Sequence, residues 1–305
     1  MTTVIRAATR GSTLARWQTD YVAALLRAVD PEVEIEVVVV ETLGDRRQDI
    51  PIWEMGGKGV FAKEVQAAVL DGRADIAVHS AKDLPSGSPE GLSIATVPER
   101  GDPRDVLVGS TLAALAPGAM VATGSARRRA QLAWARPDLT FTGLRGNIDT
   151  RLAKAADYGA IVMALAPLVR LDLLDRAAEV LEPEVMVPQV GQGTLAVECR
   201  TGDAPDDVAL RARLARIEHR PSRLALDAER GFLAELGGDC DLPAGAFATL
   251  DADETVSIEG MLASLDGHTV IRQTQVGGAS EAERLGRDVA RALLDDCGGA
   301  SLLDR

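Results

Sequence analysis

The sequence predicts an α/β protein built from two α/β domains joined by a hinge, followed by a small C-terminal α+β domain. Strand-like and helical segments alternate along most of the chain, which is typical of βα units. Glycines and a proline interrupt this alternation near residues 101–103 and 191–193, as expected where a chain crosses between domains. The last part instead carries successive strand patterns with no helix between them.

The first α/β series covers the N-terminal part of the chain. We expect strands at Val4–Ala8, Val33–Val40 and Asp75–His79, a helix that begins after Ser12 as its N-cap, and a second helix at Val60–Leu70. The alternation favours a mostly parallel sheet, and the apolar end of Val33–Val40 indicates a strand buried on at least one face. Thr42–Gly59 is polar, contains several glycines and lacks periodicity, so we expect a mobile lid loop there.

The second series begins after a crossing at Glu99–Arg104. We expect a strand that ends at Val121, a helix at Ser125–Ala135, a strand at Leu139–Thr142, a helix at Asp149–Asp157 and a strand at Ala160–Ala164. A second crossing at Gly191–Gly193 precedes a strand at Leu195–Cys199. Ligands of open α/β sheets bind beyond the carboxyl ends of the strands, so residues that follow strands are the first candidates for chemistry.

The C-terminal part has a different pattern. We expect a helix at Ser222–Leu236 capped by Ser222, antiparallel strands at Ala246–Leu250, Thr255–Ala263 and Thr269–Val276, and a final helix at Glu281–Asp295. The predicted domains are therefore residues 1–98 with 195–216, residues 99–194, and residues 217–305.

Composition excludes several classes of protein. The net charge of −13 and the aromatic content of 3% disfavour nucleic-acid binding and attachment to an anionic membrane. There is no apolar run of about 18 residues, as a membrane-spanning helix requires, and the first residues do not resemble a secretory signal. We therefore expect a cytoplasmic protein with neither nucleic-acid nor membrane partners.

Cysteine and histidine are too sparse for a metal or disulfide framework. The three cysteines are widely spaced, and the histidines show no ligand spacing, so no metal site is expected. Cys240 lies in the turn-rich segment LGGDCDLPAG. A loop cysteine is reactive if it is exposed and inert if it is buried, and the pattern alone favours the inert reading.

The segment HSAKDLP at 79–85 follows a predicted strand and ends at a proline. Lys82 and Asp83 would project from a strand end, where a cleft is expected. A carboxylate at such a place can transfer protons or stabilise a developing cation. The alternative is an ordinary solvated turn.

Arginines gather after several predicted strands. Arg127, Arg128 and Arg129 follow Ser125 at a strand-to-helix transition, where helix N–H groups favour anions and cations are unfavourable. Arg10, Arg145, Arg151 and Arg170 also follow strands or begin the next element. Because arginine binds carboxylates bidentately, this set indicates a cleft for an anion, although single arginines are usually surface residues.

Taken together in order, the motifs resemble the porphobilinogen deaminase family. They are RAATRGSTLARWQ from residue 6, TLGD, GGKGVFAKE, RADIAVHSAKDLP, ERGDPRD, ATGSARRRAQL, LRGNIDTRL, ALAPLVRL, VGQGTLAVECR and LGGDCDLPAGAFA. Each motif is weak alone, but their order and spacing over nearly the whole chain are specific.

The resemblance implies a transferase of tetrapyrrole (porphyrin and heme) synthesis. Such enzymes condense four porphobilinogens head to tail on a covalent dipyrromethane and release hydroxymethylbilane by hydrolysis, with loss of ammonia. The resemblance places the thioether of this cofactor on Cys240 and the catalytic carboxylate on Asp83. It also implies a monomer whose two main domains are like those of periplasmic binding proteins.

The resemblance also implies ligand-binding residues, because each pyrrole carries acetate and propionate groups. The cofactor side is implied for Cys240, Lys82, Asp83, Ser125, Arg127, Arg128 and Arg151. The substrate side is implied for Arg10, Ser12, Gln18, Arg145, Arg151 and Arg170.

Two departures from the family pattern concern the site. Gly124 stands where a second serine is frequent, which removes one hydroxyl contact. Asp239 and Asp241 flank Cys240 in place of glycine and a neutral residue, and nearby carboxylates should raise the pKa of its thiol and slow cofactor attachment.

Two other functions compete with the transferase. A noncatalytic two-domain protein that closes on a small polyanion would explain the hinge and the arginines without needing Asp83 or Cys240. A nucleic-acid-binding protein would use the arginine cluster, but the acidic net charge argues against it.

Overall fold

The structure is a computed structural model that describes residues 3–46, 59–237 and 242–303. The chain forms two compact units. The first contains Met1–Arg100 and Thr194–Arg223, and the second contains Gly101–Gly193 and Leu224–Arg305.

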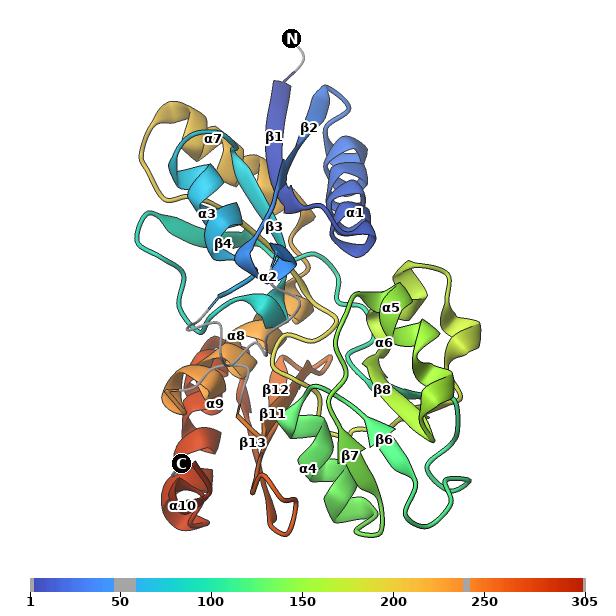
Figure 1. Ribbon diagram of the computed structural model, residues 1–305. Coiled ribbons are helices and arrows are strands. Elements are labelled where there is room, and N and C mark those ends of the chain that lie inside the picture. The colour runs from blue at the N-terminus through green and yellow to red at the C-terminus, as the bar shows by residue number, and fades with distance from the viewer. Residues whose placement is uncertain (1–2, 47–58, 238–241, 304–305) are drawn as a thin grey trace. The chain divides into compact units, whose positions relative to one another are not determined.

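The first unit is a five-stranded sheet in the order β2-β1-β3-β10-β4 (Figure 1). Its strands are β1 (Thr3–Arg10), β2 (Val33–Val40), β3 (Ile76–Ser80), β4 (Leu92–Thr96) and β10 (Leu195–Arg200). Its α-helices are α1 (Thr13–Val29), α2 (Leu43–Arg46), α3 (Lys63–Leu70) and α7 (Pro205–Leu214), with the start of α8. Leu26 of α1 and Leu214 of α7 are buried with Ile76 on one face of the sheet. On the other face, Val65 and Val69 of α3 pack with Ala77.

Four of the five strands run in the same direction, as expected for a mostly parallel sheet, and β10 is the exception. β1 is parallel to β2 and to β3, but β10 is antiparallel to both β3 and β4. The reason is topological, because a parallel neighbour needs a crossover that returns the chain to the same edge. β10 instead enters the sheet directly after the segment that belongs to the second unit.

The second unit contains another five-stranded mixed sheet, in the order β7-β6-β8-β5-β9. Its strands are β5 (Asp105–Val108), β6 (Met120–Ala122), β7 (Thr140–Thr142), β8 (Ala160–Ala164) and β9 (Glu179–Leu181). Its helices are α4 (Ala126–Ala135), α5 (Ile148–Ala153) and α6 (Leu165–Arg170). Leu132 of α4 packs on one face, and Leu152 and Leu168 pack on the other.

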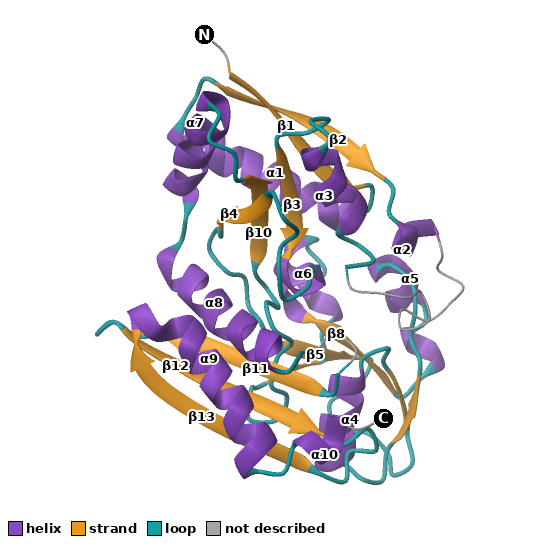
Figure 2. Ribbon diagram, turned by 90° about the vertical axis from the view of Figure 1, so that its left-hand side faces the viewer, coloured by secondary structure: helices purple, strands orange, loops and turns teal. Residues whose placement is uncertain are grey.

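The same unit contains a separate three-stranded antiparallel sheet of β11 (Ala244–Leu250), β12 (Thr255–Ala263) and β13 (Val270–Gly278). Figure 2 shows α8 (Arg220–Glu235) and α9 (Ala282–Arg291) lying along this sheet. Phe232 and Val289 from these helices are fully buried with Ile258 of β12. A π-helical turn at Ala292–Asp296 and the short α10 (Ala300–Leu303) follow α9. The predicted α/β, α/β and α+β composition is therefore confirmed.

Two local predictions need correction. Val37 and Val39 are 40% and 47% exposed, because β2 lies at the edge of its sheet, and only the residues nearer its ends are well covered. Ser222 does not cap α8, which already begins at Arg220; its Oγ instead accepts a hydrogen bond from the backbone N–H of Arg100 at 2.8 Å.

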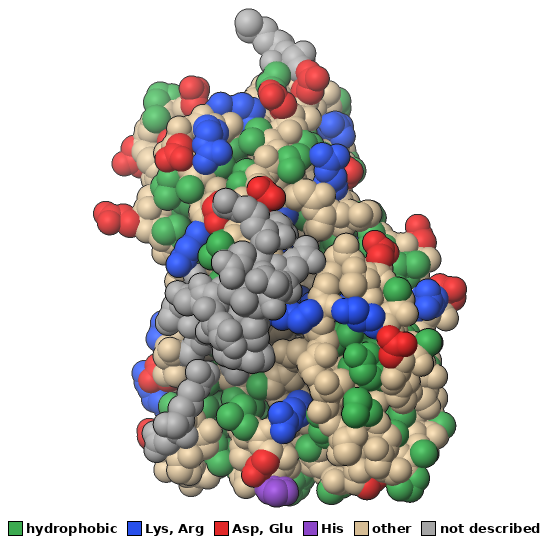
Figure 3. Space-filling view, viewed as in Figure 1, with side chains coloured by type: hydrophobic (Ala, Val, Ile, Leu, Met, Phe, Trp, Pro, Cys, Tyr) green, Lys and Arg blue, Asp and Glu red, His purple; other side chains and the backbone are tan. Residues whose placement is uncertain are grey.

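Two further features concern the described helices and one face of the surface. None of these helices is long and apolar enough to cross a membrane. On the described part of the face seen in Figure 3, acidic and basic side chains are interspersed among hydrophobic ones, and no broad basic surface is visible there.

Candidate active site

Lys82 and Asp83 lie in a 3₁₀ turn, Ala81–Asp83, that directly follows β3 in the first unit. The turn is fixed through its backbone. The N–H of Ala81 donates to Thr194 O at 3.0 Å, and the N–H of Leu84 donates to Ala81 O at 3.1 Å. Ala81 and Leu84 are each 3% exposed, whereas Lys82 and Asp83 are partly exposed. The fold therefore presents a lysine and a carboxylate on a rigid turn at a strand end.

Helix α1 supports the same strand end. Gln18 is 3% exposed, and its Nε2 donates to Ser80 Oγ at 2.8 Å, immediately before the turn. Ser12 caps α1, with its Oγ accepting from the N–H of Ala15 at 3.3 Å. The carbon of the Arg10 guanidinium lies 4.2 Å from the ring centroid of Phe61, a distance that allows a cation–π interaction. Ser80 and Phe61 were not among the sequence candidates.

His79, the first residue of the same motif, is buried. Its Nε2 lies 3.3 Å from Oε2 of Glu198 on β10. The Glu198 carboxylate also accepts hydrogen bonds from Gln66 at 2.8 Å and Ser88 at 2.7 Å. Burial raises the pKa of Glu198, but its hydrogen bonds and the charge of His79 outweigh burial and lower the pKa below its usual range.

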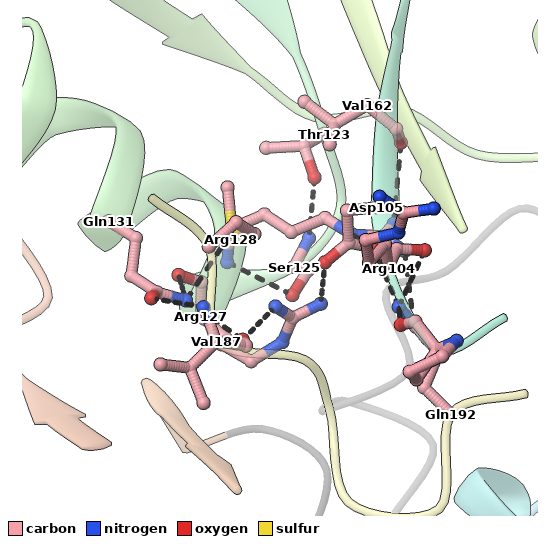
Figure 4. A network of polar contacts seen from close by, with 12 residues as sticks. Arg104, Asp105, Thr123, Ser125, Arg127, Arg128, Gln131, Val162, Val187 and Gln192 are labelled. Atoms are coloured by element: carbon pink, nitrogen blue, oxygen red, sulfur yellow. Dashed lines mark hydrogen bonds and ion pairs between the residues drawn. The ribbon is translucent and has the colours of Figure 1, made fainter. Parts of the chain in front are cut away.

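In the second unit, Arg127 and Arg128 at the start of α4 point into the protein, where one carboxylate receives both (Figure 4). Asp105 is fully buried; its Oδ2 accepts from Arg127 Nη2 at 2.8 Å. Its Oδ1 accepts from Arg128 Nε at 3.0 Å and Nη2 at 2.7 Å. Arg127 also donates to Val187 O at 2.6 Å, and Arg128 donates to Val162 O at 3.3 Å.

The electrostatics of this cluster leave an excess of positive charge. Burial opposes ionisation of Asp105, but the charges of Arg127 and Arg128 dominate and lower its pKa to about 2. Two guanidiniums thus face one carboxylate in a buried place. The Nε atom of Arg127 is buried and has no hydrogen-bond partner among the described residues.

The cluster is connected to both crossing segments. Gln192 of the second crossing donates through Nε2 to Asp105 Oδ1 at 2.9 Å and to Pro103 O at 2.6 Å. The N–H of Gly101 donates to Gly193 O at 3.0 Å. Gly193 has a φ of +83°, and a Cβ there would lie 2.3 Å from Gly101 O, so only glycine permits this close approach.

The other predicted residues of the second unit lie at helix ends and in loops. Ser125 caps α4, with its Oγ accepting from the N–H of Arg128 at 3.3 Å. Arg151 Nε donates to Gly146 O at 2.8 Å, and Arg170 Nη2 donates to Gly193 O at 2.6 Å. Arg145 lies partly exposed in the loop between β7 and α5. Arg129 is exposed, unlike its two neighbours.

Gly124 is explained by the backbone around it. A Cβ at this position would lie 2.9 Å from Leu144 O. The close approach of these two loops therefore favours glycine here.

The cysteines have different environments. Cys240 and most of the predicted lid, residues 47–58, lie outside the described residues. Cys199 is buried, which raises the pKa of its thiol to about 11. Cys297 is partly buried, and Gln273 Nε2 lies 3.2 Å from its Sγ. Among the described residues there is no cluster of three His, Cys, Asp or Glu side chains that could hold a metal ion.

The cluster of Asp105, Arg127 and Arg128 and the Ala81–Asp83 turn are suited to different kinds of chemistry. The second unit has buried cationic donors that suit carboxylates. The first unit has a partly exposed carboxylate suited to proton transfer and to stabilising positive charge.

Comparisons with known proteins give consistent results over most of the chain. The family described as "Porphobilinogen deaminase, dipyromethane cofactor binding domain" matches residues 5–206, and "Porphobilinogen deaminase, C-terminal domain" matches residues 224–295. The porphobilinogen deaminase of Nitratidesulfovibrio vulgaris (Miyazaki F) is 44% identical over 306 residues, covering 97% of this chain and 95% of that protein. That of Acidothermus cellulolyticus is 45% identical over 296 residues, covering 95% and 88%.

The matches among solved structures are more distant. The periplasmic sulfonate-binding protein SsuA from Methylobacillus flagellatus KT has a TM-score of 0.40 at 11% identity, covering 77% of this chain and 68% of that one. The substrate-binding domain of a molybdenum ABC transporter from Clostridium difficile has a TM-score of 0.42 at 11% identity, covering 71% and 92%.

Proposed function

Because the chain belongs to the porphobilinogen deaminase family, we propose that Asp83 performs its proton chemistry and that the arginines of the second unit hold the carboxylates of its cofactor. The activity itself follows from the family. The chain is a transferase of tetrapyrrole synthesis that joins four porphobilinogens on a dipyrromethane and releases hydroxymethylbilane, with loss of ammonia. The alternative of a noncatalytic polyanion-binding protein is not favoured.

The residues at the start of α4 fit a group that carries carboxylates. Arg127 and Arg128 together exceed the charge of Asp105, and the buried Arg127 Nε still has hydrogen-bonding capacity. An anionic ligand would offset the remaining positive charge. This excess charge is the observation that most directly supports the proposal for Arg127 and Arg128. The proposed cofactor-binding set also includes Ser125, the N-cap of α4, Arg151 in the last turn of α5, and Lys82 in the first unit.

The dipyrromethane, when bound, would supply the free pyrrole α-position at which the chain of substrates begins to grow. Asp83 would act next to it. Its carboxylate oxygens would accept hydrogen bonds from pyrrole N–H groups and stabilise the positive charge that develops as ammonia leaves. They would also accept the proton lost when the new carbon–carbon bond is complete. The fixed backbone of the Ala81–Asp83 turn would hold this carboxylate in place.

The substrate carboxylates would be bound by the second group of residues. Arg10, Arg145 and Arg170 supply guanidiniums for acetate and propionate, and Arg151 would serve both ligands. Ser12 and Gln18 already make structural hydrogen bonds, to Ala15 and Ser80. Their proposed part is to hold α1 and the end of β3 in register, in addition to any contact with substrate.

The proposal also covers the residue that carries the cofactor, the oligomeric state, the cellular location and the domain boundaries. The thioether is proposed on Cys240, and the protein is proposed to act as a cytoplasmic monomer. Domain boundaries are proposed at 1–98 with 195–216, 99–194 and 217–305. The separate sheets at residues 105–181 and 244–278 support a division between the last two.

An intact-mass spectrum of the purified chain, with peptide mapping, tests the cofactor and its attachment together. We expect a mass excess equal to one dipyrromethane on the Cys240 peptide, and further increases after addition of porphobilinogen. An unmodified chain should acquire the same excess on incubation with porphobilinogen. Failure to gain mass in either preparation would contradict the proposal.

A further inference from the structure

Asp105, at the start of β5, was not among the candidate residues from the sequence, yet both Arg127 and Arg128 donate hydrogen bonds to it. We propose that Asp105 is a positioning residue, whose carboxylate orients the Arg127 and Arg128 guanidiniums for binding the cofactor carboxylates. The inference rests on the proposed function of these two arginines. Asp105 itself is fully buried and would not contact the ligand.

The geometry fixes each guanidinium at two places. Asp105 holds Arg127 from one side, through Nη2 at 2.8 Å, while Val187 O holds Nη1 at 2.6 Å. A planar group bound at both amino nitrogens cannot rotate without breaking a hydrogen bond.

Arg128 is fixed more completely. Asp105 Oδ1 receives both its Nε at 3.0 Å and its Nη2 at 2.7 Å, and Val162 O receives Nη1 at 3.3 Å. The same carboxylate therefore sets the orientation of both side chains. Oδ2 accepts a hydrogen bond from Arg127, and Oδ1 accepts from Arg128.

The negative charge of Asp105 also helps to keep the two guanidiniums in place. Two guanidiniums close together in a buried environment repel each other, and without a counter-charge they would separate or draw in solvent. One carboxylate neutralises one of them and leaves the pair with a single excess charge, which suits an anionic ligand. An asparagine at residue 105 would keep nearly the same volume but leave both cations uncompensated.

The donors that remain are those a ligand would use. Val187 O and Asp105 occupy one hydrogen each on Nη1 and Nη2 of Arg127, and its buried Nε has no partner among the described residues. Fixing the inward-facing donors thus determines which donors remain available. Gln192 in turn holds Asp105, donating to Oδ1 at 2.9 Å and to Pro103 O at 2.6 Å.

The test compares Asp105→Asn with Asp138→Asn. Asp138 pairs with Arg136 just beyond the other end of α4 at 2.7 Å, but its side chain is 38% exposed, so it is a matched control outside the site. Unmodified chains of each are incubated with porphobilinogen at a temperature at which circular dichroism shows them folded, and uptake of the dipyrromethane is followed by intact mass. We expect Asp105→Asn to take it up about tenfold more slowly, the size of one lost charge-assisted hydrogen bond.

Uptake by Asp105→Asn at the rate of Asp138→Asn would overturn the inference, even if its stability were reduced, because a purely structural role affects stability alone. If Asp105→Asn does not fold, Asp105→Asn/Arg127→Gln is compared with Arg127→Gln alone. The double variant has no more buried net charge than the wild type. Slower uptake by the double variant supports positioning of Arg128, and equal uptake overturns it.

Variants of the two arginines test the premise that Arg127 and Arg128 bind the cofactor carboxylates. If Arg127→Gln and Arg128→Gln both acquire the dipyrromethane at the wild-type rate, then the proposed function of these arginines is wrong. The inference about Asp105 then fails with it. If either arginine variant is slow while Asp105→Asn is normal, only the inference fails.

Discussion

Nε2 of His79 lies 3.3 Å from Oε2 of Glu198, and the two side chains are 4% and 0% exposed. This pair joins β3 to β10, the strand that the chain adds after leaving the second unit. Ser88 and Gln66 also donate hydrogen bonds to this carboxylate. The histidine of the HSAKDLP motif therefore supports the strand that presents Lys82 and Asp83.

The first prediction concerns the pH dependence of this pair. The pKa of Glu198 is lower in the folded protein than its ordinary value of 4.5. Its ionised form therefore stabilises the fold above pH about 4.5, and this contribution disappears as the pH falls through the lowered folded pKa. Glu198→Gln should reduce the free energy of unfolding by about 2 kcal/mol at pH 7, because a buried charged hydrogen bond is lost.

Urea unfolding of wild type and Glu198→Gln between pH 7 and pH 3 measures this effect. The difference between the two proteins should shrink toward the acid end. Asp105 titrates in both proteins, so its contribution cancels in the difference. Glu90→Gln, at an exposed glutamate of the same unit, is the control and should change little. A difference that does not depend on pH would show that the Glu198 charge is unimportant.

The second prediction concerns Asp83. Asp83→Asn keeps the shape of the side chain but removes the group that accepts protons and stabilises positive charge. We expect kcat to fall on the order of 100-fold or more, with stability nearly unchanged because the side chain is partly exposed. Ammonia release and hydroxymethylbilane formation are measured on chains shown by mass to carry the cofactor. Asp71→Asn, whose side chain is 61% exposed, is the control; near-normal turnover by Asp83→Asn would exclude the catalytic assignment.

The third prediction concerns Gly124. Because a Cβ would lie 2.9 Å from Leu144 O, Gly124→Ser requires a backbone shift, and we expect it to cost about 1–3 kcal/mol. Gly143→Ser is the control, since a Cβ there meets nothing within 4 Å. Thermal unfolding of both variants measures the difference. Equal melting temperatures would mean that the loop adapts without strain.

Local patterns predicted the order and type of most elements, because hydrophobic periodicity and capping are encoded within a few residues. The helix after Ser12 and the strands Ala160–Ala164 and Thr255–Ala263 occur at the expected places. What the patterns could not reveal depends on contacts between distant residues. The antiparallel entry of β10 and the exposure of Val39 follow from strand order, which periodicity does not encode.

The same limit applies to the site. The sequence identified Arg127 and Arg128 as cations in an unfavourable position at a helix start, and it attributed them to an external anion. Asp105, more than twenty residues earlier in the chain, supplies part of that negative charge. The ERGDPRD motif contained this aspartate, but nothing in its local pattern separates it from Asp102, which pairs with Arg104 instead.

The last prediction uses the three thiols, which differ in environment. At pH 8, a pKa of about 11 leaves about one Cys199 thiol in a thousand ionised, and burial also blocks access. Iodoacetamide should therefore modify Cys199 only after unfolding in urea, whereas Cys297, which is partly buried, should react slowly in the folded protein. Cys240 should remain unmodified in both states of the cofactor-loaded chain, because its sulfur is proposed to be in a thioether.

The unmodified chain supplies the control for this experiment. There Cys240 should react, and the rate should rise with pH along a curve displaced above that of a free cysteine, because Asp239 and Asp241 disfavour the thiolate. Incubation with porphobilinogen should then protect Cys240 while leaving the reactivity of Cys297 unchanged. Alkylation of Cys240 in an unfolded chain that still carries the dipyrromethane would place the attachment at another residue. A Cys240 thiol pKa below that of a free cysteine would instead show that nearby cations, rather than the two aspartates, dominate its environment.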